Sequence, residues 1–177
     1  SSINGVWIEL NMLSDAQELG VKHVGVKLAF HQILGEGIDY VYDGKTYHFK
    51  KAFIADYDKT NSALTAKNLM VMAVVLNGWN DATPDLIAPG TQKSSNAFYY
   101  NLNTDTQAGF EQTRAIAAFL AERYNGDNHN YGKISNWVIG NEINNQQWNY
   151  IGPTDLNTYV QSYIDGFRVF YTAIKST

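Results

Sequence analysis

Four apolar segments along the chain have the patterns of β-strands. Residues 69–76 are almost continuously apolar, which is typical of a strand that is buried on both faces of a parallel sheet. Apolar and polar residues alternate over residues 24–30, and shorter apolar runs cover residues 6–10 and 137–140. We therefore expect four strands.

Helical patterns separate and follow these strands. Ser14 and Asp15 can cap a short first helix, and longer helices are expected over residues 53–67 and 107–124. A last helix opens at residues 153–154, after which apolar residues recur at helical spacing. Strands and helices alternate throughout, and this order predicts a parallel sheet with right-handed crossovers. The length of 177 residues fits a single α/β domain over residues 1–177.

The connections that follow the strands are longer than those that precede them. The connection after the second strand contains a hairpin pattern with an Asp43-Gly44 turn, the dipeptide that type I′ hairpins favour. The connection after the third strand covers residues 77–104, and the one after the fourth contains Trp148 and Tyr150. Because α/β folds place their sites at the carboxyl ends of strands, we expect the functional site at that end.

Glu142 closes the segment of the fourth expected strand, where the strand passes into its loop. A carboxylate beside an apolar strand loses solvation, so we expect a carboxyl group that can act as a general acid. The side-chain amide of the preceding Asn141 can donate a hydrogen bond to a substrate hydroxyl. The other interpretation is that this Asn-Glu pair caps the loop or bonds to neighbouring backbone.

Several of these features together resemble a known family. The short first helix, the strand entered through residues 19–26, the apolar third strand and the Asn141-Glu142 pair resemble the N-terminal half of clan A glycoside hydrolases, the cellulase-like barrels. The chain is also similar to uncharacterised bacterial proteins assigned to that barrel type. The resemblance implies the first four β/α units of a TIM (β/α)8 barrel, a half-barrel. It also implies that Glu142 is the acid/base and that Asn141 contacts the sugar 2-hydroxyl.

The chain departs from this family at other positions. Clan A enzymes take their nucleophile from the end of the seventh strand, whereas the pattern here ends after the fourth unit. Lys27 stands in the second strand where cellulase-like members usually carry Arg, and Asn77 follows the third strand where they carry His. We expect both side chains to line the site. We also expect this chain alone, without the nucleophile half, to be inactive.

Aromatic residues and one histidine complete the expected site. Trp79, Trp148 and Tyr150 lie in the loops and can stack on sugar rings, although a loop tryptophan often only anchors its loop. His31 follows the second strand and is placed to enter the site, the alternative being a packing role. The histidines show no paired metal-ligand spacing, so we expect neither a metal nor another cofactor.

Other residues have simpler interpretations. Glu9 lies in the first expected strand and Asp81 just past the third, so either can reach the site, but salt bridges and loop caps are the commoner roles of such residues. We expect Asp58, in the helical pattern over residues 53–67, to be solvated. Trp7 and Trp137 lie within strand patterns and are expected in the core.

Composition narrows the classes of partner. A net charge of −4 gives no basic footprint for nucleic acid. The absence of cysteine excludes disulfides and thiolate metal sites. No segment approaches the roughly 18 apolar residues of a membrane-spanning helix. Aromatic residues make up 14% of the chain and, with its many asparagines, suit a neutral polar ligand such as a sugar.

The expected function is hydrolysis of a β-linked poly- or oligosaccharide by a retaining mechanism, in a bacterial protein that is extracellular or on the cell surface, otherwise cytoplasmic. One alternative is a non-catalytic carbohydrate-binding or interaction module. Another is an unrelated doubly wound domain, whose strand order would reverse at a switch point. A half-barrel has two open edges and an uncovered inner face. We expect a homodimer or a C-terminal half of the protein to cover them.

Overall fold

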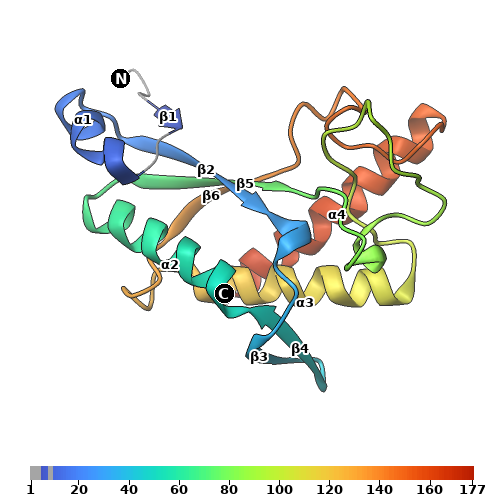
Figure 1. Cartoon of the computed structure of the whole chain (residues 1–177), viewed down its shortest axis with the longest axis horizontal. Coiled ribbons are helices and arrows are strands. Elements are labelled where there is room, and N and C mark those ends of the chain that lie inside the picture. The colour runs from blue at the N-terminus through green and yellow to red at the C-terminus, as the bar shows by residue number, and fades with distance from the viewer. Residues whose placement is uncertain (1–4, 8–9) are drawn as a thin grey trace.

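Four parallel strands lie side by side in the order in which they occur along the chain (Figure 1). The computed structural model describes residues 5–7 and 10–177. Each neighbouring pair in the main sheet is parallel, and among these four strands the order does not reverse. The strands of this sheet, in spatial order, are β1 (Gly5–Trp7), β2 (His23–Ala29), β5 (Met70–Leu76) and β6 (Ile134–Ile139).

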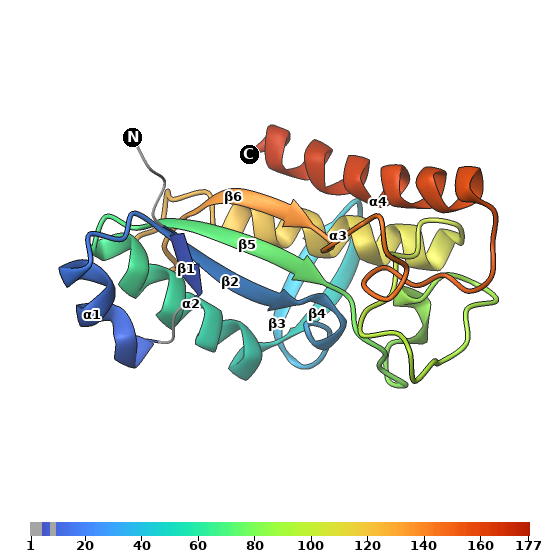
Figure 2. The same cartoon turned by 90° about the horizontal axis from the view of Figure 1, so that it is seen from above.

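Helices join these strands, and a separate hairpin is inserted after β2. The alternation of parallel strands and helices confirms the predicted α/β class. Figure 2 shows α4 lying beside α3 along the β6 side of the sheet. The helices are α1 (Leu13–Glu18), α2 (Lys51–Ala66), α3 (Gln107–Arg123) and α4 (Leu156–Ser176). Three short 3-10 turns are η1 (Leu10–Met12), η2 (Phe30–Gln32) and η3 (Pro84–Leu86). The hairpin consists of β3 (Gly37–Tyr42) and β4 (Lys45–Lys50).

The ends of some elements differ from the sequence-based expectation. Ser14 and Asp15 lie inside α1 rather than capping it, because the helix begins one residue earlier and its first residue follows the turn η1 directly. β6 begins at Ile134 and ends at Ile139, so it is shifted toward the N-terminus of the predicted segment. Residues 8–9 of the first predicted strand lie outside the described residues.

Side chains cap the two longest helices. The Thr106 hydroxyl accepts a hydrogen bond from the backbone N–H of Gly109 (3.1 Å) at the start of α3. At the start of α4, the Asp155 carboxylate accepts hydrogen bonds from the backbone N–H and the hydroxyl of Thr158 (3.0 and 2.7 Å). Each cap satisfies a backbone donor that the helix itself leaves without a partner.

The hairpin predicted from the Asp43-Gly44 pair is confirmed. Asp43 and Gly44 have φ of 50° and 74°, and a type I′ turn requires positive φ at both positions. The hairpin packs on α3, where the rings of Tyr40 and Phe49 lie 5.3 and 4.3 Å from the ring of Phe119. This insertion therefore lies on the helical side of the molecule, below the sheet in Figure 1.

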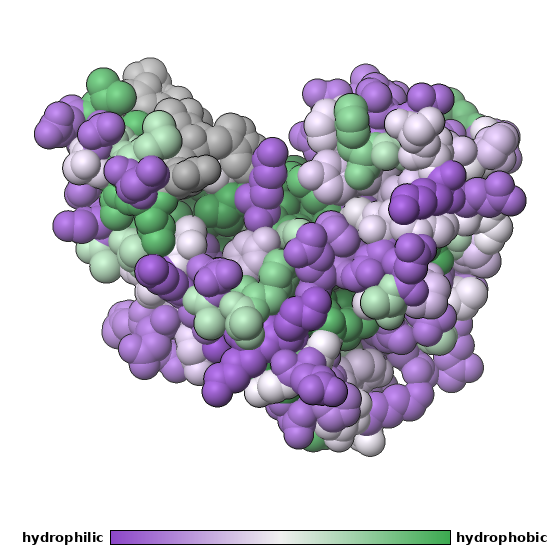
Figure 3. Space-filling view, in the orientation of Figure 1, coloured by the Kyte–Doolittle hydropathy of each residue, from purple (hydrophilic) through white to green (hydrophobic). Residues whose placement is uncertain are grey.

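The face of the sheet that points away from α2 and α3, which we call the open face, is partly exposed, although Val74 at its centre is only 5% exposed. The strand register places Lys27 of β2, Val74 of β5 and Val138 of β6 side by side on it. Lys27 is exposed, and Val138 is 37% exposed. In Figure 3 this side of the sheet lies in a hollow between the α1 end and the loops at the opposite end, and apolar groups line its floor.

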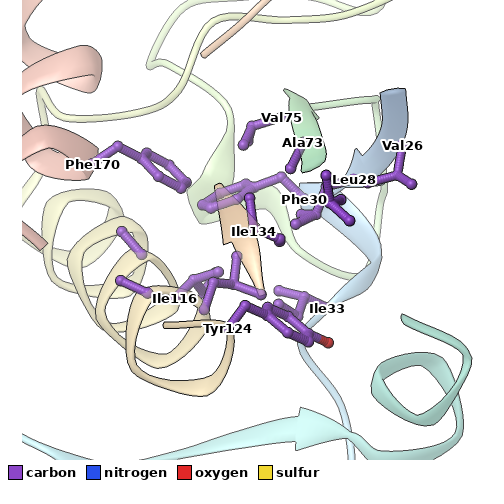
Figure 4. Packing of buried hydrophobic residues seen from close by; sticks show 14 of the residues in the cluster. Val26, Leu28, Phe30, Ile33, Ala73, Val75, Ile116, Tyr124, Ile134 and Phe170 are labelled. Carbon is purple, nitrogen blue, oxygen red and sulfur yellow. The ribbon is translucent and has the colours of Figure 1, made fainter. Parts of the chain in front are cut away.

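The opposite face of the sheet carries the core. Val24 and Leu28 alternate along β2 and are buried, and Ala73 and Val75 of β5 lie beside them. Figure 4 shows these strands meeting Ile116 of α3 in one apolar cluster. Full burial of an aliphatic or aromatic side chain contributes about 1.5–3 kcal/mol. This layer therefore holds the helices on the sheet and fixes the direction in which the strands end.

Candidate functional site

The carboxyl ends of β2, β5 and β6 lie at one edge of the sheet, where the long loops gather (Figure 2). Parallel pairing brings the segments that leave these strands to the same end of the molecule. Six of the predicted site residues lie in those segments: His31 after β2, Asn77 and Trp79 after β5, and Asn141, Glu142 and Trp148 after β6.

Glu142 lies beyond the strand, on a turn that exposes its side chain. β6 ends at Ile139, and both Gly140 and Glu142 have positive φ, 78° and 44°. This backbone conformation costs a non-glycine residue about 1–2 kcal/mol, and such strain is common at functional sites. The side chain of Glu142 is exposed. The expectation that the apolar strand would shield it from water is wrong, because two residues separate Glu142 from the end of the strand.

Asn149 holds this turn in place. Its side-chain amide donates a hydrogen bond to the backbone carbonyl oxygen of Asn141 (2.7 Å), and its side chain is buried. A Cβ at Gly140 would lie 2.3 Å from Oδ1 of Asn149, so the close approach requires glycine there. Sequence reasoning misses Asn149, because nothing distinguishes it from the other asparagines of this segment.

His31 connects the ends of β2 and β5. Its Nδ1 accepts a hydrogen bond from the backbone N–H of Gly78 (2.7 Å), which leaves the ring proton on Nε2. Nε2 lies 3.3 Å from the side-chain amide nitrogen of Gln32. Burial lowers the pKa of His31 from its ordinary value of 6.5, and a hydrogen bond with the Leu76 backbone acts in the opposite direction. His31 is therefore neutral at physiological pH.

Asn77 supports the long loop after β5. Its side-chain amide donates a hydrogen bond to the backbone carbonyl oxygen of Leu86 (2.8 Å). The backbone carbonyl oxygen of Asn77 accepts a hydrogen bond from the backbone N–H of Tyr100 (2.7 Å). Only 3% of Asn77 is exposed. We therefore assign it to the loop framework and not to the surface that would contact a ligand.

Trp79 lies at the start of the same loop. Its indole N–H donates a hydrogen bond to Oδ1 of Asp81 (2.6 Å), and its ring meets the ring of Tyr100 edge-on at 5.2 Å. Trp79 is half-buried, so part of the ring remains accessible. Asp81, which was expected either to reach the site or to cap a loop, fixes the orientation of this indole.

Trp148 lies where the loops after β5 and β6 meet. Its ring stacks on Tyr99 (5.8 Å between centroids) and also contacts Phe98 (5.0 Å). The backbone N–H of Phe98 donates to the carbonyl oxygen of Gln147 (2.8 Å), and that of Tyr150 donates to Tyr99 (3.0 Å). The two loops are therefore joined by backbone hydrogen bonds, with the half-buried rings of Tyr99 and Trp148 between them and the ring of Phe98 exposed.

Two open cavities lie beside these loops. One has a volume of about 280 Å³ and is lined by Trp79, Asp81 and residues 87–91 among others. The other has a volume of about 710 Å³ and lies between residues 88–90 and the polar start of α4, which contributes Asn157. The larger volume is within the range of roughly 300–1,000 Å³ that small-molecule sites occupy.

Lys27 does not belong to the loop edge. It lies within β2, two residues before the strand ends, and its side chain is on the open face of the sheet. Its carbonyl oxygen accepts a hydrogen bond from the hydroxyl of Tyr57 on α2 (2.9 Å). Lys27 can therefore contact a ligand only if that ligand extends from the loop edge over the open face.

The remaining predictions have mixed outcomes. Asp58 is not solvated as expected, because Arg123 on α3 binds its carboxylate and leaves the side chain 16% exposed. Trp137 is partly buried and packs against the core, as predicted. Glu9 and the side chain of Trp7 lie outside the described residues.

Over residues 5–7 and 10–177, no group of three or more His, Asp or Glu side chains is arranged to hold a metal ion. No helix within the same described ranges has both the length and the apolar character needed to cross a membrane.

Comparison with protein families identifies the family of the chain. No curated protein and no solved structure matches it. Residues 1–177 match a family described as a family of unknown function, DUF5722. Because this match extends over the whole sequence given, the chain belongs to the DUF5722 family.

Proposed function

We propose that the chain is part of a glycoside hydrolase-like protein that acts on a β-linked poly- or oligosaccharide, with Glu142 as the acid/base. The observation that carries the proposal is the placement of Glu142. It is an exposed carboxylate at positive φ, at the carboxyl edge of a parallel sheet, where the aromatic loops with Trp79 and Trp148 also lie. This edge is where α/β folds bind their ligands.

The sheet is proposed to be half of a TIM (β/α)8 barrel. The sequential order of the parallel strands and the position of the helices on one face support this proposal. In such a barrel, Lys27 and Val138 on the other face would point into the interior. The edges β1 and β6 would pair with further strands. On α4, the side chains of Val160, Phe167 and Tyr171 are 43, 42 and 54% exposed, and a neighbouring helix would cover them.

The covering half would come from a second copy or from a C-terminal half of the protein. Light scattering separates the two, since closure by a second copy predicts twice the 19.9 kDa of the chain. Phe167→Lys places a charge in the exposed row of α4 and is expected to weaken such a dimer. A well-behaved monomer would contradict closure by a second copy.

The proposed chemistry uses Glu142 twice. The protonated carboxyl group donates its proton to the glycosidic oxygen as a nucleophilic carboxylate bonds to the anomeric carbon and displaces that oxygen. The Glu142 carboxylate then accepts a proton from the water that attacks the anomeric carbon and displaces the nucleophile. A retaining mechanism also needs a nucleophilic carboxylate about 5–5.5 Å from the acid/base. The family resemblance assigns that group to a seventh strand, in the covering half. Asn141, Trp79 and Trp148 are proposed to hold the sugar.

The acid/base assignment is tested by Glu142→Gln in the protein with its covering half. Glutamine keeps the size and the hydrogen-bonding capacity of the side chain but has no proton to transfer. Turnover of β-linked oligosaccharides is expected to fall about 10²–10⁴-fold, with binding largely retained. The matched control is Glu18→Gln, an exposed carboxylate on α1. Unchanged turnover in Glu142→Gln would overturn the assignment.

The exposure of Glu142 favours a second candidate, a non-catalytic carbohydrate-binding module. A general acid is commonly a carboxyl group that the protein shields from water, and the described structure does not shield this side chain. In this case the protein binds β-linked oligosaccharides, as measured by calorimetry, but releases no new reducing ends even with its covering half present. That combination of results distinguishes the two candidates.

A further inference from the structure

A single residue after β2, His31, receives hydrogen bonds from three residues of the loop that leaves β5. The backbone N–H of Gly78 donates to its ring Nδ1 (2.7 Å). The side-chain amide of Asn80 and the hydroxyl of Thr83 both donate to its backbone carbonyl oxygen (2.7 and 3.3 Å). The beginning of the loop is therefore tied to the neighbouring strand at one point.

The ring of His31 also fits sterically against this loop. A Cβ at Gly78 would lie 2.6 Å from Cε1 of the ring and 2.7 Å from its Nε2, closer than real Cβ contacts. The imidazole thus occupies the space where a side chain would stand, and only glycine permits the contact. Trp79 follows Gly78 in the sequence, so the contact between His31 and Gly78 fixes the backbone position from which the indole extends.

The loop segment that His31 holds also contributes to the wall of a cavity. Trp79, Asn80 and Asp81 form part of the wall of the 280 Å³ cavity, and Asp81 accepts the hydrogen bond of the indole N–H (2.6 Å). A movement of Gly78 therefore changes the position of the aromatic ring beside that cavity.

We propose that neutral His31 is the positioning residue for Trp79, and that protonation of its ring releases the Gly78–Trp79 end of the loop. A protonated imidazole carries hydrogen on both nitrogens, so Nδ1 can no longer accept the bond from the Gly78 N–H. The bonds from Asn80 and Thr83 to the carbonyl oxygen do not depend on protonation. The loop therefore stays attached at Asn80 and Thr83 while Gly78 and Trp79 move.

The surroundings of the ring are consistent with a switch below neutral pH. Burial lowers the pKa of His31, while the Leu76 backbone opposes this effect. Within the described part of the chain, the groups that hydrogen-bond to the ring are uncharged, namely the backbone of Leu76 and the N–H of Gly78, and the side-chain amide of Gln32 that lies 3.3 Å from Nε2 is uncharged as well. Desolvation therefore outweighs the other influences, and the bound state of the loop is the state at neutral pH.

Fluorine NMR of the fluorotryptophan-labelled chain tests the proposal. The chain has four tryptophans, and Trp79→Phe identifies the resonance of Trp79 by its loss. On titration from about pH 8 to about pH 4.5, the Trp79 resonance is expected to shift with a midpoint below 6.5. The other tryptophan resonances report global unfolding, which would shift all of them together.

Two variants test whether His31 causes the pH-dependent shift of the Trp79 resonance. His31→Gln removes the titrating ring and is expected to abolish the pH-dependent shift of Trp79. His48→Gln, an exposed histidine that pairs with Asp39 on the hairpin, is expected to leave it unchanged. A Trp79 resonance that does not move in the parent chain, or that moves equally in His31→Gln, overturns the proposal.

Direct observation of the imidazole covers the case in which His31→Gln does not fold. Nitrogen NMR of the labelled histidines in the parent chain is expected to show His31 with its proton on Nε2 at neutral pH, titrating at the same midpoint as Trp79. Different midpoints, or a proton on Nδ1, overturn the proposal. None of these readouts involves a glycan, so failure here is distinct from failure of the proposed hydrolase function.

Discussion

Arg123 on α3 binds Asp58 on α2 through two parallel hydrogen bonds, from Nε to Oδ1 (2.8 Å) and from Nη2 to Oδ2 (2.6 Å). Tyr124 adds a third bond, from its hydroxyl to Oδ1 (3.1 Å). The guanidinium also lies 3.6 Å from the ring centre of Tyr131. Although burial opposes it, the bond and charge of Asp58 raise the pKa of Arg123. This cluster joins the two helices that cover the sheet.

Asp58→Ala is expected to destabilise the fold by about 3 kcal/mol in urea unfolding, because it leaves the Arg123 guanidinium without its partner at a site only 15% exposed. Asp56→Ala, an exposed carboxylate on the same helix, is the control and is expected to change stability by less than about 0.5 kcal/mol. Equal effects of the two substitutions would show that the Arg123–Asp58 pair does not stabilise the contact between the helices.

Two phenylalanines on α4 offer a test of where the core lies. Phe170 is 1% exposed and its ring lies 5.9 Å from Phe30, whereas Phe167 is 42% exposed. Phe170→Ala is expected to cost about 3–5 kcal/mol, because it removes a fully buried ring and leaves a cavity. Phe167→Ala is expected to cost much less. Thermal and urea unfolding of both variants measure the difference, and a larger loss at Phe167 would mean that α4 packs through its other face.

Substitution of two glycines at positive φ distinguishes the cost of backbone strain from the cost of steric overlap. A Cβ at Gly132 (φ 77°) would lie 2.4 Å from the backbone of Asn61 on α2, whereas a Cβ at Gly20 (φ 71°) would meet nothing within 4 Å. Gly20→Ala is expected to cost about 1–2 kcal/mol from strain alone. Gly132→Ala is expected to cost about 1–3 kcal/mol more, because the helix must move. Equal losses in urea unfolding would contradict the close contact between this loop and α2.

The framework of the fold is predictable from the sequence because it depends on neighbouring residues. Burial of a strand or a helix face repeats every two or 3.6 residues, so residues 69–76 predict β5 and residues 107–124 predict α3. The hairpin turn is equally local, since Asp43 and Gly44 tolerate the positive φ that it requires. The edge of the sheet that gathers the loops then follows from parallel pairing.

Contacts between residues that are far apart in the sequence cannot be predicted from these patterns. Arg123 and Asp58 are 65 positions apart, and no periodicity marks them as partners. His31 follows β2 and Gly78 follows β5, yet the hydrogen bond between them depends on the rotamer of the imidazole and on the absence of a side chain at Gly78. The exposure of Glu142 likewise depends on where β6 ends, because the apolar run alone suggested a strand that continued nearly to the carboxylate.

The carboxylate that caps α4 is expected to contribute to acid sensitivity. Hydrogen bonds from the hydroxyl and backbone N–H of Thr158 lower the pKa of Asp155 from its ordinary value of 3.8. A carboxyl group whose pKa is lower in the folded state adds stability above its unfolded pKa, and this stability is lost as the pH falls through the folded value. Asparagine also caps helices but does not titrate.

Asp155→Asn is therefore expected to reduce the difference in Tm between about pH 7 and about pH 3, without abolishing it. Part of the difference should persist because Lys45 and Gln107 also lower the pKa of Glu111 on α3. Asp56→Asn, an exposed position within α2, controls for the loss of one negative charge and is expected to leave the difference nearly unchanged. If both variants reduce the difference equally, the acid sensitivity comes from overall charge, and the cap of α4 has no special part in it.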